Sequence, residues 1–325
     1  MSQQHSVHRI GNIAVIGVGG VGGYFGGKLC RLLRENTGCT VSFLARGEHL
    51  RAIQQDGLLL HSDDGDLICK PSLAVDAFDQ LPPPDLCLLC VKEFDLAPAL
   101  LHLHPLIRDH TVILPLLNGV DISARVRRVI ANGILLPACV YVGTHIERPG
   151  VISQKGGACK ILFGPDPLHL QFSPDEILHL FTLASIKCEW MADIQAEIWK
   201  KFVFICAFGL VTAAFDKTVG QVLDHDTLRT DAQNIVNEAI QLAEASGVRL
   251  PADTAEAALL KARNFPYETK TSFQRDFERS DRKDERDLFA GAMLRIAGQF
   301  RILIPTTQRV AAILGKRKPA PRTLA

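Results

Sequence analysis

Two adjacent lysines stand at the start of a nearly apolar run, EIWKKFVFICAFGLVTAAF, at residues 197–215. On a helix, Lys200 lies one turn after Glu197, and a surface ion pair explains it. Lys201 instead shares an apolar stripe with Ile198 and Ile205. A lysine in apolar surroundings loses its charge readily, and its ammonium group can stabilise and protonate the oxygen of a ketone that accepts a hydride. Lys201 is therefore a candidate general acid, and a purely structural lysine is the alternative.

A glycine-rich stretch follows the apolar run NIAVI and opens a helical pattern. Its GxGxxG spacing allows a tight turn, close approach of backbone amides to a pyrophosphate, and binding at a helix N-terminus. A glycine-rich turn without a ligand is the alternative. Gly23, Gly26 and Gly27 continue into the helix, where each glycine costs up to about 1 kcal/mol relative to alanine. Close packing of the helix on a strand or a ligand should compensate this cost. The predicted dinucleotide-binding residues are Gly17, Val18, Gly19, Gly20, Val21 and Gly22.

The next strand-like run, TVSFLA, ends at Arg46 without an acidic residue at its tip. An Asp or Glu in this place would bind the ribose hydroxyls of NAD, whereas an arginine can fork onto the 2′-phosphate of NADP(H). The sequence therefore predicts NADPH as the cofactor. Glu48, two residues later, weakens the argument, and a solvated loop is the alternative interpretation of Arg46.

Two polar residues end later strand-like runs: Lys92 follows DLCLLCV and Asn118 follows TVILPLL. Ligands of open α/β sheets bind at the carboxyl ends of the strands, so both are candidates for cofactor or substrate contacts. Lys92 can instead extend from a strand end into solvent, and Asn118 begins an ordinary Asn-Gly turn. Cys87 and Cys90 form a CxxC inside a strand, where this spacing sends the side chains to opposite faces, so we predict no metal site.

The elements that must position these residues change in character along the chain. From residue 12 to about 152, short apolar runs alternate with helical segments, which predicts a parallel, doubly wound sheet. ACVYVGTHIERPGVI and ACKILFG add strands around an RPG turn. After about Cys188 only helical periodicity remains. The sequence therefore predicts an α/β Rossmann-type domain at 1–188, followed by an all-α domain at 189–325.

Composition is that of an ordinary soluble enzyme. The formal charge of +1 gives no reason to expect a nucleic-acid or membrane partner, and a small molecule is the expected ligand. The apolar run 202–215 is shorter than the roughly 20 residues that span a bilayer. The first residues resemble no secretory signal, and nine scattered cysteines favour free thiols, so a cytoplasmic location is expected.

Together these motifs resemble those of the ketopantoate reductase (2-dehydropantoate 2-reductase) family. The resemblance extends from residue 12 to about 314, in the right order, and rests on GVGGVG, the Arg46 strand end, VK, NG, IWKKF and TSFQRDFERSDRKDERDLFAG. It implies NADPH-dependent reduction of a 2-oxo acid. It implies that Lys201 is the catalytic lysine, that Lys92 and Asn118 lie beside the nicotinamide and substrate, that Ser272 binds substrate, and that Glu285 holds the substrate hydroxyl and the lysine.

Two departures from the family pattern are visible. One extra residue separates Asp276 from the glutamate, so anchoring on Gly291 selects Glu285, whereas anchoring on Asp276 selects Asp284. Ile205 and Gly209 stand where the family has asparagines that bind the substrate. Losing two amides removes hydrogen bonds worth about 0.5–1.5 kcal/mol each, so the 2-oxo acid can differ while the hydride chemistry survives.

The sequence thus gives a leading function and two alternatives. The leading expectation is reduction of 2-dehydropantoate to pantoate, a step in pantothenate biosynthesis. A paralogous reductase of a less polar 2-oxo acid is one alternative, and a non-catalytic NADP(H)-binding protein is the other.

Thr271 and Gln274 also form a T-x-x-Q capping box, which makes Ser272 the first residue of a helix. A homodimer is compatible with the sequence, which does not decide the oligomeric state.

Overall fold

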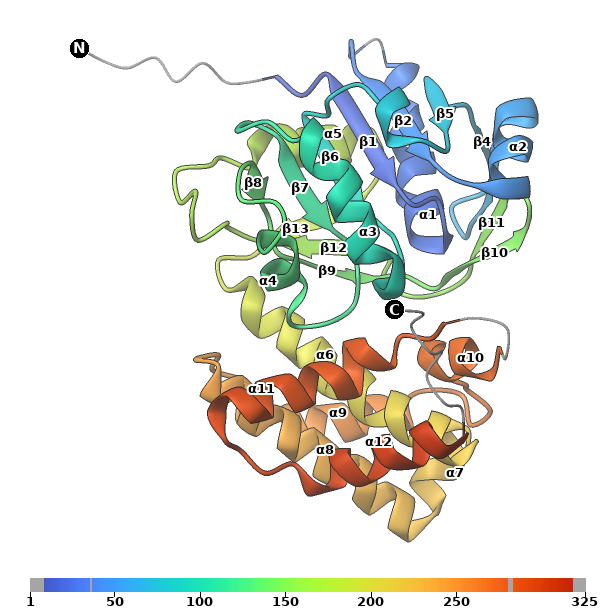
Figure 1. Ribbon diagram of the computed structural model, residues 1–325. Helices are drawn as coiled ribbons and strands as arrows, with labels where there is room; N and C mark the ends of the chain where they lie inside the picture. Colours follow the sequence, from blue (N-terminus) through green and yellow to red (C-terminus); the bar gives the residue numbers. More distant parts are fainter. Residues whose placement is uncertain (1–8, 36, 280–282, 318–325) are drawn as a thin grey trace. The chain divides into compact units, whose positions relative to one another are not determined.

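The computed structural model describes residues 9–35, 37–279 and 283–317 (Figure 1). The chain divides into two compact units, and each is described by itself. The first comprises residues up to 117 together with 122–194, and the second comprises 118–121 together with residues from 195 onward. The boundary predicted at residue 188 falls inside the last strand, Lys187–Trp190, and the short segment Asn118–Asp121 was not expected in the helical unit.

A parallel sheet of six strands forms the centre of the first unit. Its strand order is β5-β2-β1-β6-β7-β8, the classical Rossmann order once the strands outside this sheet are left out. The chain reverses direction across the sheet between β1 and β6, which is where open α/β sheets bind ligands. The strands are β1 Asn12–Ile16, β2 Thr40–Leu44, β5 Leu73–Val75, β6 Leu86–Leu89, β7 Val112–Pro115 and β8 Ile134–Leu135.

Two smaller sheets complete the first unit. One has the order β10-β11-β3-β4, in which β3 and β4 form an antiparallel hairpin, and β10 and β11 flank the RPG turn. The other has the order β13-β12-β9. Their strands are β3 Leu58–His61, β4 Leu67–Cys69, β9 Ala138–Tyr141, β10 Thr144–Arg148, β11 Val151–Gln154, β12 Lys160–Phe163 and β13 Lys187–Trp190.

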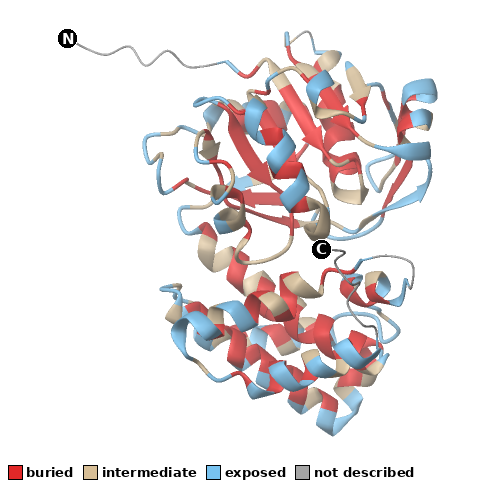
Figure 2. Ribbon diagram, viewed as in Figure 1, coloured by how far each residue is buried: buried red, intermediate tan, exposed pale blue. Residues whose placement is uncertain are grey.

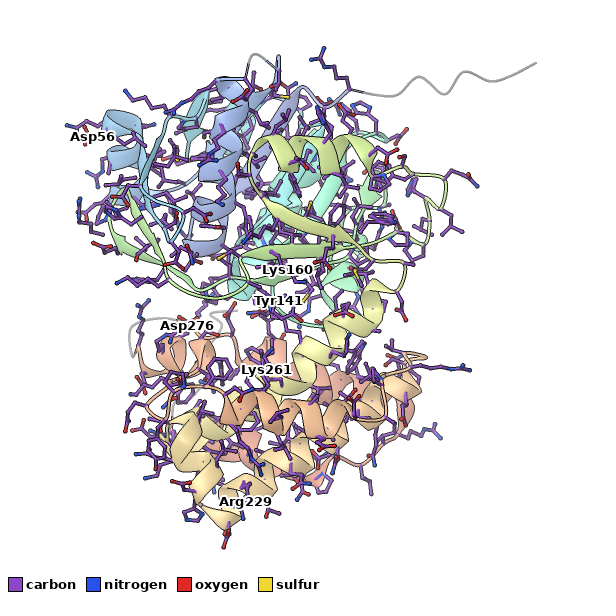
Figure 3. All side chains as sticks on the ribbon, turned by 180° about the vertical axis from the view of Figure 1, so that it is seen from behind. Asp56, Tyr141, Lys160, Arg229, Lys261 and Asp276 are labelled. Atoms are coloured by element: carbon purple, nitrogen blue, oxygen red, sulfur yellow. The ribbon has the colours of Figure 1, made fainter. Side chains whose placement is uncertain are left out.

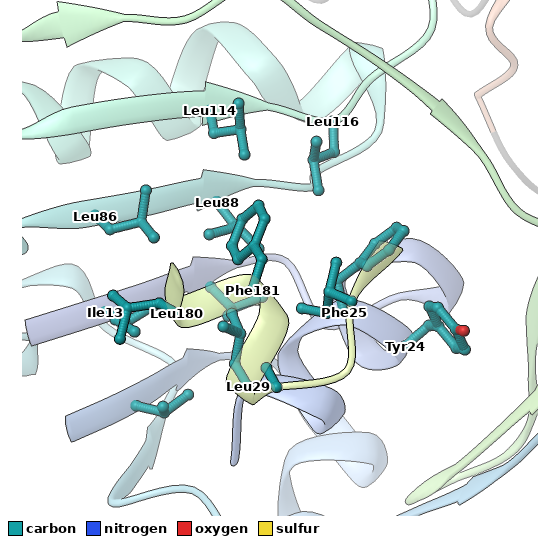
Figure 4. Close-up of a cluster of buried hydrophobic side chains, with 14 of the residues drawn as sticks. Ile13, Tyr24, Phe25, Leu29, Leu86, Leu88, Leu114, Leu116, Leu180 and Phe181 are labelled. Atoms are coloured by element: carbon teal, nitrogen blue, oxygen red, sulfur yellow. The ribbon is translucent and has the colours of Figure 1, made fainter. Parts of the chain in front are cut away.

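The helices of the first unit connect these strands: α1 Gly20–Leu29, α2 Gly47–Asp56, α3 Glu93–Leu103, α4 Ile122–Arg127 and α5 Asp175–Leu183. Figure 4 shows Phe25 and Leu29 of α1 with Leu180 and Phe181 of α5 against aliphatic side chains of the central strands. Continuous apolar runs such as LCLL in β6 are buried along their whole length, as expected of strands covered on both faces.

The second unit is helical, as predicted. Its helices are α6 Ile194–Phe215, α7 Val219–Asp224, α8 Asp226–Ala245, α9 Thr254–Arg263, α10 Ser272–Glu278, α11 Ala292–Phe300 and α12 Pro305–Arg317, with a π-helical turn at Asp287–Gly291. Figure 2 shows buried residues along much of α6, whose neighbours cover it on several sides.

The helix α6 begins at Ile194 and has 22 residues, so it is longer than the apolar run 202–215 that it contains. By length and composition α6 can cross a membrane, but 72% of its most apolar window is buried inside the fold. Such burial is typical of the core helix of a globular domain. The apolar character of α6 is therefore explained by packing.

Candidate active site

The glycine loop follows β1 and is shaped by contacts that exclude side chains. Gly17 has a φ of +93°, and its N–H donates to the carbonyl of Leu44 at 3.1 Å. A Cβ on Gly22 would lie 2.0 Å from the Gly17 carbonyl oxygen, whereas a Cβ on Gly19 would meet nothing within 4 Å. The loop thus needs glycine at 17 and 22 to close, and it leaves open space at Gly19, the N-cap of α1. This arrangement fits a pyrophosphate at a helix N-terminus.

The remaining glycines of α1 allow close packing, as predicted. A Cβ on Gly23 would lie 2.5 Å from Ile152, and one on Gly26 would lie 2.9 Å from the ring of Phe43. At the start of the helix, a Cβ on Gly20 would lie 2.8 Å from Oγ1 of Thr144 on β10. Nothing in the sequence pattern pointed to Thr144, because β10 is distant from the glycine loop along the chain. Its hydroxyl lies beside the proposed phosphate-binding turn.

Arg46 lies between β2 and α2, where it is the N-cap residue of the helix. Its Nη2 is 2.6 Å from Oδ2 of Asp95 on α3, and its side chain is 80% exposed. Arg46 is therefore neither buried nor a simple solvated residue, since one edge of the guanidinium is held by a carboxylate. The other donors of its fork can accept a phosphate.

His49, which the sequence interpretation overlooked, joins α2 to the turn between β10 and β11. Its Nδ1 accepts a hydrogen bond from the N–H of Gly150 at 3.0 Å. Burial lowers the pKa of His49, opposed in part by the backbone of Val18 in the glycine loop. The lowered pKa indicates a neutral imidazole, and the accepting Nδ1 places its proton on Nε2.

Lys92 and the two cysteines lie at the end of β6. Lys92 is exposed and is the N-cap of α3, so it lies beside the carboxyl ends of β1 and β6, where the strand order of the sheet reverses. Burial raises the pKa of the Cys87 thiol to about 12, and that of Cys90 rises as well. Cys90 packs on the glycine loop, because a Cβ on Gly22 would lie 2.9 Å from its Cβ. Both cysteines are free, and the described residues contain no cluster of metal-ligating side chains.

The two lysines of α6 have different partners. Lys200 pairs with Glu197, as the spacing predicted. Lys201 donates from Nζ to Oδ1 of Asn118 at 2.8 Å, although the two residues are 83 positions apart. Asn118 belongs to the same compact unit as α6, so this contact lies inside one unit. The structure thus brings together two residues that the sequence singled out separately.

The two acidic candidates after α10 are both buried, at 8% and 6% exposure for Asp284 and Glu285. Both carboxylate oxygens of Asp284 accept from the guanidinium of Arg286, at 2.8 Å each. This fork occupies Asp284 in a structural ion pair. Of the two, Glu285 is therefore the better candidate for chemistry, which agrees with the choice that Gly291 gave as the anchor.

Ser272 begins α10 and is exposed. Thr271 caps the helix by accepting from the N–H of Gln274 at 3.2 Å. The predicted capping box is only half present, because the side chain of Gln274 instead donates to Asp216 at 3.4 Å. Asp276, the alternative anchor for the acidic residue, lies on the same helix (Figure 3).

The apolar departures on α6 are also visible. Ile205 is half-buried one turn after Lys201. Gly209, one turn later, faces α10, where a Cβ would lie 3.6 Å from Cβ of Phe273. The stripe that follows Lys201 therefore offers Ile205, and Gly209 bordered by Phe273, at the two positions where the resemblance implied asparagines.

A cavity of about 380 Å³ lies elsewhere in the second unit, and Arg229 on its wall is labelled in Figure 3. Its lining residues are Gly220, Leu223, Asp224, Arg229, Arg263, Phe265 and Tyr267. None of them is a predicted site residue. The guanidinium of Arg229 is already bound to the Leu223 carbonyl and to Asp226, so we assign this cavity no part in the chemistry.

Comparison with known families identifies the family of the chain. Residues 13–167 match the model described as ketopantoate reductase PanE/ApbA, and residues 193–318 match its C-terminal counterpart. The chain belongs to the ketopantoate reductase family. Members of this family are NAD(P)H-dependent oxidoreductases that act on small molecules.

Similar proteins cover nearly the whole chain. The uncharacterized oxidoreductase YkpB of Bacillus subtilis is 26% identical and covers 90% of this chain and 93% of its own length. A 2-dehydropantoate 2-reductase of Mesorhizobium japonicum is 27% identical, and the match covers 89% of this chain and 93% of the relative. The crystal structure of a PanE/ApbA family ketopantoate reductase from Ralstonia eutropha superposes with a TM-score of 0.84 at 27% identity, covering 93% and 97%.

Proposed function

We propose that this ketopantoate reductase family member reduces a 2-oxo acid with NADPH, and that 2-dehydropantoate is its first candidate substrate. The observation that carries the proposal is the 2.8 Å hydrogen bond from Lys201 Nζ to Asn118 Oδ1. It holds an ammonium group at a defined place, at the start of the apolar stretch of α6. The 2-dehydropantoate 2-reductases among its relatives support the substrate.

In this proposal Lys201 is the general acid. NADPH, when bound, supplies the hydride that adds to the ketone carbon. Lys201 stabilises the negative charge that develops on the ketone oxygen and donates the proton that completes the alcohol. Asn118 accepts from the ammonium and so fixes its direction. Glu285, buried at 6% exposure, would hold the substrate hydroxyl and the lysine.

The cofactor would be held by the glycine loop and by the end of β2. Backbone N–H groups at the N-terminus of α1 would bind the pyrophosphate in the open space beside Gly19. Arg46 would bind the 2′-phosphate, supported by its exposed guanidinium, one Nη of which is bound to Asp95. Lys92, at the end of β6, and Asn118 would contact the nicotinamide and the substrate, and Ser272 would bind the substrate from the start of α10.

A second candidate substrate is a less polar 2-oxo acid. It is favoured by Ile205 and Gly209, which offer no hydrogen bond where the family has amides, and by Phe273, which borders Gly209. Without these amides, the 4-hydroxyl of 2-dehydropantoate would lose up to two hydrogen bonds of about 0.5–1.5 kcal/mol each. An apolar branched side chain would instead gain contacts with this surface.

The test follows the absorbance of NADPH with purified protein against a panel of 2-oxo acids headed by 2-dehydropantoate. The panel pairs it with 2-oxoisovalerate derivatives that lack the hydroxyl. A higher kcat/KM for 2-dehydropantoate supports the first substrate, and indifference to the hydroxyl supports the second. NADH replaces NADPH in a parallel assay, and equal use of both would refute the role of Arg46. No turnover with any member would refute the proposed function.

We further propose that the enzyme acts in the cytoplasm, serves pantothenate biosynthesis and forms a homodimer. The first proposal rests on the free cysteines, and the second on the named relatives. Sedimentation of the purified protein over a range of concentrations tests the third, which a monomer at all concentrations would refute.

A further inference from the structure

The short segment Asn118–Asp121 is tied to the helical unit by two side-chain contacts. At its start, Asn118 accepts from Lys201 on α6 at 2.8 Å. At its end, Asp121 Oδ2 accepts from Nη2 of Arg295 on α11 at 3.0 Å. These contacts explain why four residues that follow β7 group with helices that are distant along the chain.

Arg295 also holds the turn that follows Glu285. Its Nη1 donates to Oδ1 of Asp287 at 2.6 Å, and its Nη2 donates to the backbone carbonyl of Asp287 at 3.2 Å. Asp287 is the first residue of the π-helical turn and lies two positions after Glu285. A Cβ on Gly291 would lie 2.2 Å from Asp287 Oδ1, so only glycine there lets the carboxylate fold back toward Arg295.

One guanidinium therefore joins the segment that carries Asn118 to the turn that begins two residues after Glu285. The planar fork of arginine suits this task, because it presents several donors in fixed directions, whereas a lysine presents a single rotating ammonium. We infer that Arg295 is a positioning residue of this enzyme: it sets Asn118 and Glu285 in place around Lys201. The inference rests on the proposed function, in which these three residues act together.

The expected effect is on geometry more than on stability. Arg295 is 43% exposed and Asp287 is 44% exposed, and exposed ion pairs contribute about 0–1 kcal/mol. A displacement of about 1 Å at a reacting group can, however, lower the rate roughly hundredfold. Loss of Arg295 should accordingly lower kcat strongly in a protein that remains folded.

The experiment compares Arg295→Met and Arg295→Lys with Arg309→Met as the matched control. Arg309 is an arginine of the same unit, 51% exposed and paired with Asp231, and its partner belongs to neither segment. We expect Arg295→Met to lower kcat about tenfold or more. Arg295→Lys should recover part of the loss, since one cation can hold one of the two carboxylates. Arg309→Met should keep kcat within about twofold, while its loss of a partner for the buried Asp231 shows how kcat responds to lower stability alone.

Hydrogen exchange supplies a readout that does not depend on turnover. In Arg295→Met, peptides that cover residues 116–124 and 283–291 should exchange faster than in the native protein, while peptides of α1 and β2 should not change. The dissociation constant of NADPH, measured by its fluorescence, should change much less than kcat, because the glycine loop and Arg46, which would hold its phosphates, belong to the other unit.

The outcomes separate the two claims. Unchanged kcat and unchanged exchange in Arg295→Met would overturn the positioning role, whatever the substrate. Faster exchange with unchanged kcat would also overturn it, because the bridge would then be structural only. If the native protein turns over no 2-oxo acid, the proposed function fails, and the exchange experiment still decides whether Arg295 joins the two segments.

Discussion

Replacing Lys201 by methionine removes the ammonium group and keeps most of the length of the side chain. Methionine fits an apolar helix stripe, so α6 should still pack. Lys200→Met is the matched control, because Lys200 lies one residue away on the same helix and pairs with Glu197. The two variants differ in which lysine loses its charge and in little else.

The expected magnitudes follow from the contacts of each lysine. A positioned general acid contributes about 10²–10⁴-fold to the rate, or about 3–5 kcal/mol in the activation barrier. The hydrogen bond from Lys201 to Asn118 involves a charged donor, so its loss should cost about 1.5–3 kcal/mol of stability at most. The Lys200 pair on the helix surface is worth about 0.2–0.5 kcal/mol.

The assay measures initial rates of NADPH oxidation at saturating 2-oxo acid, together with thermal unfolding of each variant. Lys201→Met should lower kcat by at least about hundredfold while NADPH still binds. Lys200→Met should keep kcat within about twofold. Full turnover in Lys201→Met, together with loss of turnover in Lys200→Met, would show that the wrong lysine was assigned along α6.

Three other expectations concern groups with clear physical environments. Burial holds the pKa of His49 below its ordinary value of about 6.5, so the unfolded chain binds more protons than the folded protein just below pH 6.5. The free energy of unfolding should therefore decrease as the pH falls through this range. Urea unfolding at about pH 7.5 and about pH 5.5 measures the decrease, and His49→Asn should remove the part that His49 contributes. Gly22→Ala should lower the free energy of unfolding by about 1–3 kcal/mol, whereas Gly19→Ala should leave it unchanged and weaken NADPH binding, as thermal shifts with and without NADPH would show. Glu285→Gln should lower kcat about tenfold or more with little loss of stability. Asp284→Asn should mainly lower the free energy of unfolding, by about 1.5–3 kcal/mol, because it weakens the ion pair with Arg286. If kinetics and unfolding show the reverse pattern, Asp284 is the active carboxylate and Glu285 the structural one.

Local patterns in the sequence predicted the elements well where one period dominated. The buried strands β1, β6 and β7 read as continuous apolar runs, and the glycine motif between β1 and α1 specified its own turn. Boundaries were weaker, since β13 continues past residue 188 and α6 begins before the apolar run. A short amphipathic strand and a helix start carry little periodicity of their own, so tertiary pairing decides them.

In the candidate site, too, the sequence identified single residues, and the tertiary structure decided which of them meet. The sequence could single out Lys201 and Asn118, because each is polar in an apolar context or at a strand end. It could not join them, since 83 residues separate them and single-chain periodicity carries no information about such distances. Thr144 and His49 were overlooked for the same reason: their neighbours, Gly20 and Gly150, are far away along the chain.

The sequence by itself determined the order of the two domains, the glycine loop, the separation of the two lysines on one helix, and the resemblance to its family. These properties depend on spacing along a helix, a strand or a turn, which neighbouring residues dictate. The tertiary structure alone decided that Lys201 meets Asn118, and that Arg295 joins Asp121 to Asp287. Those contacts form only when packing brings distant segments together, because the atoms that meet share no local pattern.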